Sequence, residues 1–127
     1  EQNATRWEFK ELARMEAMDI WQPDVSRCGG ISELMQIADL ADQHGVRVIP
    51  HAWKSGILKA ASLHVNSVMG GQRIQEWCTA ENPLARDLVS TDQTLKAGYA
   101  GVPTTPGIGV EIDQSVIDKY RLHETKG

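Results

Sequence analysis

The chain has 127 residues and a formal net charge of −4, which suits one domain with a modest buried core. Without a basic run or stripe, nucleic acid and anionic membranes are not expected as partners, and no apolar stretch is long enough to span a membrane. Two isolated cysteines, Cys28 and Cys78, lack CxxC spacing, which fits a reducing cytoplasm better than a disulfide framework, and we interpret both as packing residues. No signal-peptide pattern opens the chain, and because it begins with Glu1 rather than Met, we expect it to be the remainder of a longer protein.

The first two predicted elements are a helix and a strand. Thr5, followed by Glu8 three residues later, forms a capping-box pattern and predicts a helix through about residue 17. A short apolar run over residues 18–22 predicts a strand that ends just before Asp24. The turn after this strand is rich in glycine, as a tight reversal requires.

The alternation of helix and strand then continues. Ser32 is expected to cap a second helix that ends at Gly45, and residues 46–49 form the next predicted strand. A third helix is predicted over residues 55–69, followed by a strand over residues 73–77. The inward face of the third helix is expected to carry Ile57, Ala61, Val65 and Val68. The order α-β-α-β-α-β predicts an α/β fold with a parallel sheet and right-handed crossovers.

The pattern changes after about residue 80. Prolines and glycines break the remaining segment into turns and short strands, with one small helix over about residues 114–120. Three strands cannot close a barrel, because a complete barrel of this kind needs roughly 250 residues. We therefore expect residues 1–80 to form half of a (β/α) barrel and residues 81–127 to form a C-terminal extension.

Asp24 and His51 follow the first two predicted strands, each directly after a proline. Two parallel strands joined by a helix place their carboxyl ends side by side, on the rim where α/β enzymes carry their chemistry. A carboxylate beside an imidazole at this rim indicates a general base, because the carboxylate fixes the tautomer and stabilises the imidazolium. The structural alternative is that both residues are ordinary turn residues after a strand.

Three stretches together resemble the enolase superfamily, and within it the mandelate racemase-like branch that includes many acid-sugar dehydratases. They are DIWQPDVSRCGGISE at residues 19–33, VIPHAWKSGI at residues 48–57 and PGIGVEID at residues 106–113. The resemblance covers essentially the whole chain. It implies a partial TIM-type barrel, made of the last three strand–helix units plus a C-terminal extension that packs toward the capping domain.

The resemblance also implies roles for four residues. Asp24 and His51, 27 positions apart, match the base dyad at the ends of the sixth and seventh barrel strands. Glu76 matches a residue that hydrogen-bonds the substrate carboxylate or enolate. Glu1, 23 positions before Asp24, matches the third carboxylate of the Mg²⁺ site. Relatives that resemble muconate-lactonizing enzymes carry a lysine where this chain has Asp24, which favours the branch with the histidine dyad.

Other interpretations of these residues remain open. Glu1 could be a solvated terminal residue, and Glu76 could be the salt-bridge partner of Arg73. Trp53 and Lys54 are expected to open the next helix rather than to border substrate. The remaining histidines and the turn after Asp24 are expected to serve packing, the surface or tight turn geometry: His44, His64, His123, Ser26, Arg27, Gly29 and Gly30.

The expected function is that of an Mg²⁺-dependent enzyme that abstracts the proton α to a carboxylate, in particular an acid-sugar dehydratase, which is a carbon–oxygen lyase. The alternatives are a racemase or epimerase of a 2-hydroxy acid and a non-catalytic βα assembly module. Two further metal carboxylates, the opposite-face base and most of the capping domain are not in the chain, so we expect it to be inactive alone. Unpaired strand edges and the uncovered side chains of Ile20, Val48 and Ile74 predict a homo-oligomer.

Overall fold

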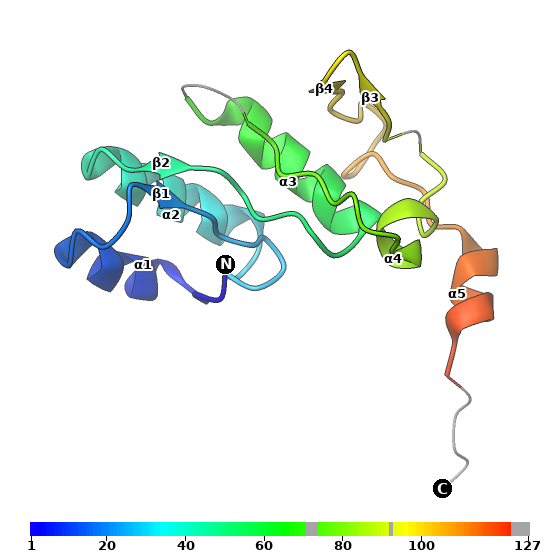
Figure 1. Ribbon diagram of the computed structural model, residues 1–127, viewed down its shortest axis with the longest axis horizontal. Coiled ribbons are helices and arrows are strands. Elements are labelled where there is room, and N and C mark those ends of the chain that lie inside the picture. The colour runs from blue at the N-terminus through cyan, green and yellow to red at the C-terminus, as the bar shows by residue number, and fades with distance from the viewer. Residues whose placement is uncertain (71–73, 92, 123–127) are drawn as a thin grey trace, which may run out of the picture.

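The computed structural model describes residues 1–70, 74–91 and 93–122. Its elements, in chain order, are α1 (Arg6–Arg14), β1 (Ile20–Trp21), α2 (Ile31–Gln43), β2 (Arg47–Val48), α3 (Gly56–Val68), α4 (Pro83–Arg86), β3 (Leu95–Lys96), β4 (Tyr99–Ala100) and α5 (Gln114–Tyr120). Figure 1 shows α3 in the middle of the molecule, with α1, α2, β1 and β2 on one side and the C-terminal elements on the other. The predicted helix–strand alternation is confirmed as far as α3.

The first two strands pair in parallel, as predicted. Ile20 lies opposite Arg47, and Trp21 lies opposite Val48. The regular ladder is shorter than the predicted strands because a proline follows each one and has no backbone N–H to donate. Pairing nevertheless resumes at an isolated parallel bridge between Asp24 and His51. The parallel register therefore extends to the rim that carries the two predicted site residues.

The prediction of a third strand over residues 73–77 is wrong for the residues that the structure describes. Residue 73 lies outside the described residues, and residues 74–77 form no strand. Their polar contacts run through side chains: the Asn66 amide donates to the carbonyl of Ile74 at 2.9 Å, and the backbone N–H of Ala52 donates to the Glu76 carboxylate at 2.6 Å. Ala52 therefore gives its backbone donor to a side chain and not to a third strand.

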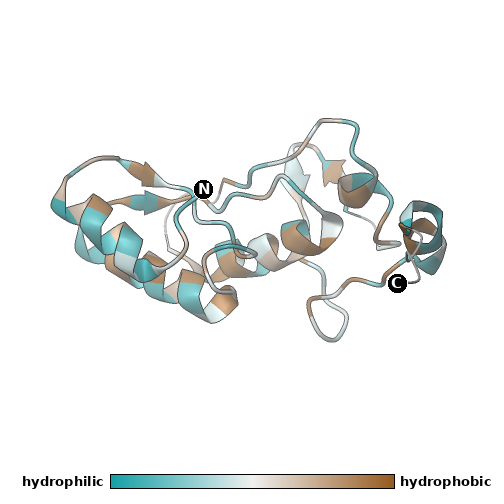
Figure 2. Ribbon diagram, turned by 90° about the horizontal axis from the view of Figure 1, so that it is seen from below, coloured by the Kyte–Doolittle hydropathy of each residue, from teal (hydrophilic) through white to brown (hydrophobic). Residues whose placement is uncertain are grey.

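The hydrophobic core lies on the helical side of the sheet. Trp21 is 1% exposed and packs against Phe9 of α1, with ring centroids 5.2 Å apart. The core also contains buried residues from the turn before α2, from α2 and from α3: Cys28, Leu34, Ile37, Ala38, Ala41, Leu58, Ala61 and Val65. In Figure 2 hydrophobic and hydrophilic residues alternate along these helices, as expected for elements with one buried face.

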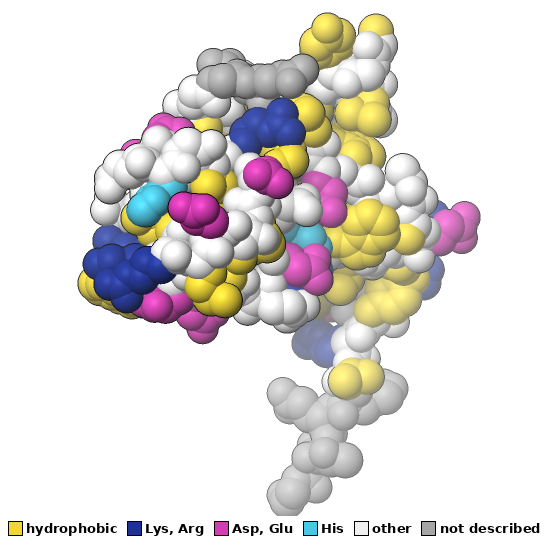
Figure 3. All heavy atoms as spheres, turned by 60° about the vertical axis from the view of Figure 1, so that its left-hand side comes forward, with side chains coloured by type: hydrophobic (Ala, Val, Ile, Leu, Met, Phe, Trp, Pro, Cys, Tyr) yellow, Lys and Arg dark blue, Asp and Glu magenta, His cyan; other side chains and the backbone are white. Residues whose placement is uncertain are grey.

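The opposite face of the sheet is open. Ile20 alternates with Trp21 along β1, and it is 36% exposed; Ile74 is 43% exposed and Val48 is half-buried. Hydrophobic side chains accordingly reach the surface in several places in Figure 3. The prediction that these side chains lack a covering layer agrees with the exposure of Ile20 and Ile74, but it is wrong for Val48, which lies opposite Trp21 and packs against the core.

The helix ends follow the sequence signals only in part. Thr5 is the N-cap of α1, but its side chain makes no capping bond, and Glu8 accepts from the backbone of Ala4 at 2.9 Å. The N-cap of α2 is Gly30 rather than Ser32, with a φ of 95° that a side-chain residue rarely adopts. Gly45, with a φ of 67°, ends α2 as predicted.

Helix α3 is buried on two sides because it lies between the sheet unit and the C-terminal segment. Ser55 caps it and accepts from the backbone of Leu58 at 3.1 Å. The predicted inward residues Ile57 and Val68 are instead 37% and 68% exposed. Gly56 begins the helix under the C-terminal segment, and a Cβ there would lie 2.5 Å from a methyl group of Val89.

The C-terminal segment consists of turns and short elements, as predicted. Strands β3 and β4 form an antiparallel hairpin, and a bridge between Val89 and Ile112 closes the segment on itself. Helix α5 coincides with the small helix predicted over residues 114–120. Within the ranges that the structure describes, no helix has the length and apolar character needed to cross a membrane.

Candidate active site

Asp24 and His51 are hydrogen-bonded neighbours at the end of the parallel pair. The His51 Nδ1 atom lies 2.9 Å from Oδ2 of Asp24. Asp24 is fully buried and His51 is 8% exposed. The backbone holds the pair in place, because the N–H of His51 donates to the carbonyl of Pro23 at 3.0 Å. The predicted contact is therefore confirmed.

The surroundings of Asp24 keep it ionised. Its Oδ1 accepts from the backbone and the hydroxyl of Ser26 at 2.7 and 2.6 Å, and its Oδ2 accepts from Lys54 at 3.0 Å. Burial raises the pKa of Asp24, but the hydrogen bonds from Ser26, Lys54 and His51 outweigh burial and bring the pKa to about 2. An ionised acceptor at Oδ2 favours a proton on Nδ1 of the imidazole, and Nε2 is the ring nitrogen that faces the rim.

The Nε2 side of His51 faces two glutamates. Glu1 Oε2 lies 2.8 Å from Nε2, and Glu76 Oε2 lies 3.8 Å from it. Glu76 is fixed by the hydrogen bond that it accepts from the backbone of Ala52. The structure thus brings all four predicted site residues together around one imidazole.

This side of the imidazole opens into a cavity of about 340 Å³. It is lined by Glu1, Arg27, His51, Trp53, Lys54 and Glu76. Acidic and basic side chains therefore both face the space in front of the basic nitrogen.

The described residues do not by themselves supply a site for Mg²⁺. Within the described part of the chain, no group of three or more histidine, cysteine, aspartate or glutamate side chains could hold a metal ion. The carboxylate of Glu1, the predicted ligand, is directed at the His51 ring. Mg²⁺ prefers octahedral oxygen coordination, which one carboxylate paired with an imidazole does not provide.

Sequence analysis missed the contribution of Lys54 and Ser26. Lys54 was expected to open a helix, but its ammonium binds both Asp24 and the Ser26 hydroxyl, the latter at 3.2 Å. Ser26 was assigned to turn geometry, although its position two residues after an aspartate is typical of an Asx turn that orients the carboxylate. Lys54 follows His51 by three residues, and only the chain reversal at the rim turns it back toward Asp24.

The other predicted histidines lie away from this site. His44 is exposed at the end of α2, and the half-buried His64 bonds the carbonyl of Ile108 at 3.1 Å, which supports a packing role. His123 and Arg73, the alternative partner of Glu76, lie outside the described residues. The predicted site therefore depends on one histidine within the described chain.

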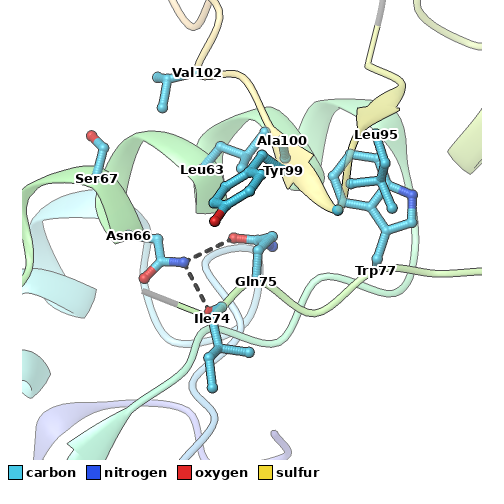
Figure 4. A pocket seen from close by; sticks show the side chains of 11 residues that line it. Leu63, Asn66, Ser67, Ile74, Gln75, Trp77, Leu95, Tyr99, Ala100 and Val102 are labelled. Carbon is cyan, nitrogen blue, oxygen red and sulfur yellow. Dashed lines mark hydrogen bonds between the residues drawn. The ribbon is translucent and has the colours of Figure 1, made fainter. Parts of the chain in front are cut away.

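A separate cavity of about 520 Å³ lies between α3 and the β3–β4 hairpin (Figure 4). Leu63, Trp77 and Tyr99 are among its lining residues, and the Asn66 amide bonds the backbone of Ile74 within it. None of its described lining residues is a carboxylate or an imidazole. It therefore lacks the acid–base groups found at the rim.

Comparison with known proteins gives the family. The model of the enolase C-terminal domain-like family matches residues 1–116, and the chain belongs to this family. The predicted membership of the enolase superfamily is thereby confirmed.

Named relatives cover nearly the whole chain. The chain is 34% identical to D-galactarolactone cycloisomerase of Agrobacterium fabrum, over 84% of this chain. It is 37% identical to arabinonate dehydratase of Saccharolobus solfataricus, over 92% of this chain. The structure of 3,6-anhydro-D-galactonate cycloisomerase from Zobellia galactanivorans superposes with a TM-score of 0.86 at 31% identity, over 93% of this chain and 33% of that one. The chain spans about 30% of the length of the two curated relatives.

Proposed function

We propose that this chain supplies the base dyad of an enzyme that removes the proton α to the carboxylate of an acid sugar and then eliminates the β-hydroxyl group. The observation that carries the proposal is the Asp24–His51 pair, whose Nε2 faces the rim cavity. The dehydratases and cycloisomerases among the relatives support the same class of chemistry.

In the proposed reaction, Nε2 of His51 takes the α-proton, and ionised Asp24 stabilises the imidazolium that forms. Glu76 accepts one backbone hydrogen bond at Oε2, which leaves Oε1 available to carry a proton toward the developing oxyanion. The imidazolium of His51 then returns its proton to the departing β-hydroxyl, which leaves as water. The resulting enol becomes a 2-oxo acid.

We propose Mg²⁺ dependence only for a longer protein that contains this chain. Glu1 is the ligand that this chain would contribute, and other carboxylates would have to come from outside these 127 residues. Glu1 would also have to leave Nε2 before His51 could act as a base, because the two atoms are 2.8 Å apart. Calorimetric titration of the chain alone with Mg²⁺ should show no tight binding, and tight stoichiometric binding would contradict this assignment.

We also propose that within a longer protein residues 1–80 form the last three strand–helix units of a (β/α) barrel, although residues 74–77 form no strand in this chain, with residues 81–127 as an extension toward a capping domain. The family match and the superposition on a longer relative support this division. The exposed side chains of Ile20 and Ile74 support self-association of the chain when nothing else covers them. Sedimentation should therefore show a dimer or a larger assembly, and a stable folded monomer at micromolar concentration would contradict it.

A second candidate function is isomerisation without loss of water. Two of the relatives are named as cycloisomerases, and both reactions begin with the same proton abstraction. The dyad of His51 and Asp24 would have the same role in either case. Product analysis separates the two, since elimination gives a 2-oxo acid and isomerisation keeps the elemental composition of the substrate.

A chimera tests the proposal directly. The matching segment of arabinonate dehydratase is replaced by this chain, and the product is assayed with Mg²⁺ on a panel of aldonates and aldarates. We expect 2-oxo acid to form, and no turnover from the 127-residue chain alone. A folded chimera without activity on the whole panel, or robust turnover by the chain alone, would contradict the proposal.

A further inference from the structure

Lys59 of α3 is a buried lysine on the side of the helix that faces the C-terminal segment. The residue is only 7% exposed. The ammonium lies 4.3 Å from the ring centroid of Trp77 and donates to the carbonyl of Ala85 at 3.4 Å. Within the described residues it forms no ion pair with a carboxylate.

This arrangement leaves the ammonium incompletely satisfied. An ammonium has three N–H donors, and burying a charge is costly unless it is paired or hydrogen-bonded. One long hydrogen bond and one aromatic face use part of this capacity. Burial accordingly lowers the pKa of Lys59. The nearby Arg86 does not share this condition, because it is paired with Asp87 through two hydrogen bonds.

Gln93, in the segment packed over the start of α3, also has an unused polar group. Its amide nitrogen donates to the carbonyl of Gly56 at 2.9 Å. Its amide oxygen is buried and has no hydrogen-bond partner among the residues that the structure describes. Lys59, Trp77 and Gln93 all line one cavity of about 580 Å³ beside α3. The residues that carry a buried cation and an unpaired acceptor thus line the same space.

We propose that this cavity binds a small hydroxy-carboxylate. The carboxylate accepts from the Lys59 ammonium, a hydroxyl group donates to the amide oxygen of Gln93, and the carbon chain lies against Trp77. Glu81 also lines the cavity, so a single negative charge is favoured over a dianion. None of these residues lines the rim cavity around His51, and the proposal holds whether or not the rim site is catalytic.

The test uses the 127-residue chain and three compounds that separate the two recognition groups. Gluconate carries a carboxylate and hydroxyl groups, hexanoate carries only the carboxylate, and glucitol carries only hydroxyl groups. Binding is followed by NMR through the side-chain signals of Lys59, Trp77 and Gln93. Gluconate should shift all three signals saturably, and both control compounds should bind more weakly.

Two lysine variants provide the matched comparison. Lys59→Met keeps the apolar stem and removes the charge. Lys10→Met is the control, because Lys10 is exposed and its ammonium also lies over an indole ring, 5.9 Å from the ring centroid of Trp7. Lys59→Met should weaken gluconate binding at the cavity at least about tenfold, as expected for a lost hydrogen bond between charged groups. Lys10→Met should leave it unchanged.

Three results would overturn the proposal. The first is the absence of gluconate-dependent shifts at Lys59, Trp77 and Gln93 in the unmodified chain, which does not depend on how any variant folds. The second is equal binding of hexanoate or glucitol. The third is unchanged gluconate binding in a Lys59→Met variant whose circular dichroism matches that of the unmodified chain.

Discussion

Lys54 and His51 share one oxygen atom: the ammonium of Lys54 lies 3.0 Å from Oδ2 of Asp24, and Nδ1 of His51 lies 2.9 Å from the same atom. Both donors stabilise the ionised form of a fully buried carboxylate. Lys54 therefore helps to keep the Asp24 carboxylate ionised, although it is not one of the two dyad residues.

Lys54→Met should raise the pKa of Asp24 from about 2 toward its ordinary value of 3.8, because the carboxylate loses one of its hydrogen-bond donors. The measurement is a carbon-detected NMR titration of the Asp24 carboxyl group. Lys10→Met, on the exposed surface of α1, is the control and should leave the titration unchanged. An unaltered pKa in Lys54→Met would show that the ion pair does not contribute.

Asp24 should also make the stability of the chain depend on pH. Its pKa is lower in the folded chain than in the unfolded chain, so its contribution is present above pH 3.8 and is lost as the pH falls through about 2. The shift corresponds to about 2 kcal/mol at neutral pH. Urea unfolding between pH 7 and pH 2 should show this decline, and Asp24→Asn should remove it.

The control for the stability measurement is Asp39→Asn, at an exposed position on α2. It should leave the pH dependence of the unmodified chain intact. A decline in stability of equal size in the Asp24→Asn variant would assign the effect to other carboxylates.

Gly56→Ala should destabilise the chain by about 1–3 kcal/mol, because the added methyl group forces repacking against Val89. The new Cβ would lie 2.5 Å from a Val89 methyl group, which outweighs the better helix propensity of alanine. Gly101→Ala is the matched control, since nothing lies within 4 Å of a Cβ at that position. Equal unfolding free energies for the two variants would contradict the close packing at the start of α3.

The dyad was predictable because it depends on local signals. Each of the two runs before Asp24 and His51 is apolar and ends at a proline, and one helix separates them, so parallel pairing brings their ends together. The positions of Glu1 and Glu76 came from family resemblance alone, and the structure places both beside the imidazole.

The errors arose where the answer depends on contacts between distant segments. The strand over residues 73–77 needs a backbone partner, but the N–H of Ala52 is used by the Glu76 side chain. The inward face of α3 was misjudged at Ile57 and Val68 because a helix with two buried sides does not show a single apolar stripe. The contact of Lys54 with Asp24 likewise forms only after the rim has folded.

The most direct test of the proposed chemistry is the turnover of two histidine variants in the chimera with arabinonate dehydratase. His51→Asn removes the basic nitrogen that faces the rim cavity, whereas His44→Asn changes an exposed histidine at the end of α2. We expect His51→Asn to lower kcat by about 10²- to 10⁴-fold, as for loss of a general base, and His44→Asn to leave it unchanged. Undiminished turnover in a folded His51→Asn chimera would contradict the assignment of His51 as the base.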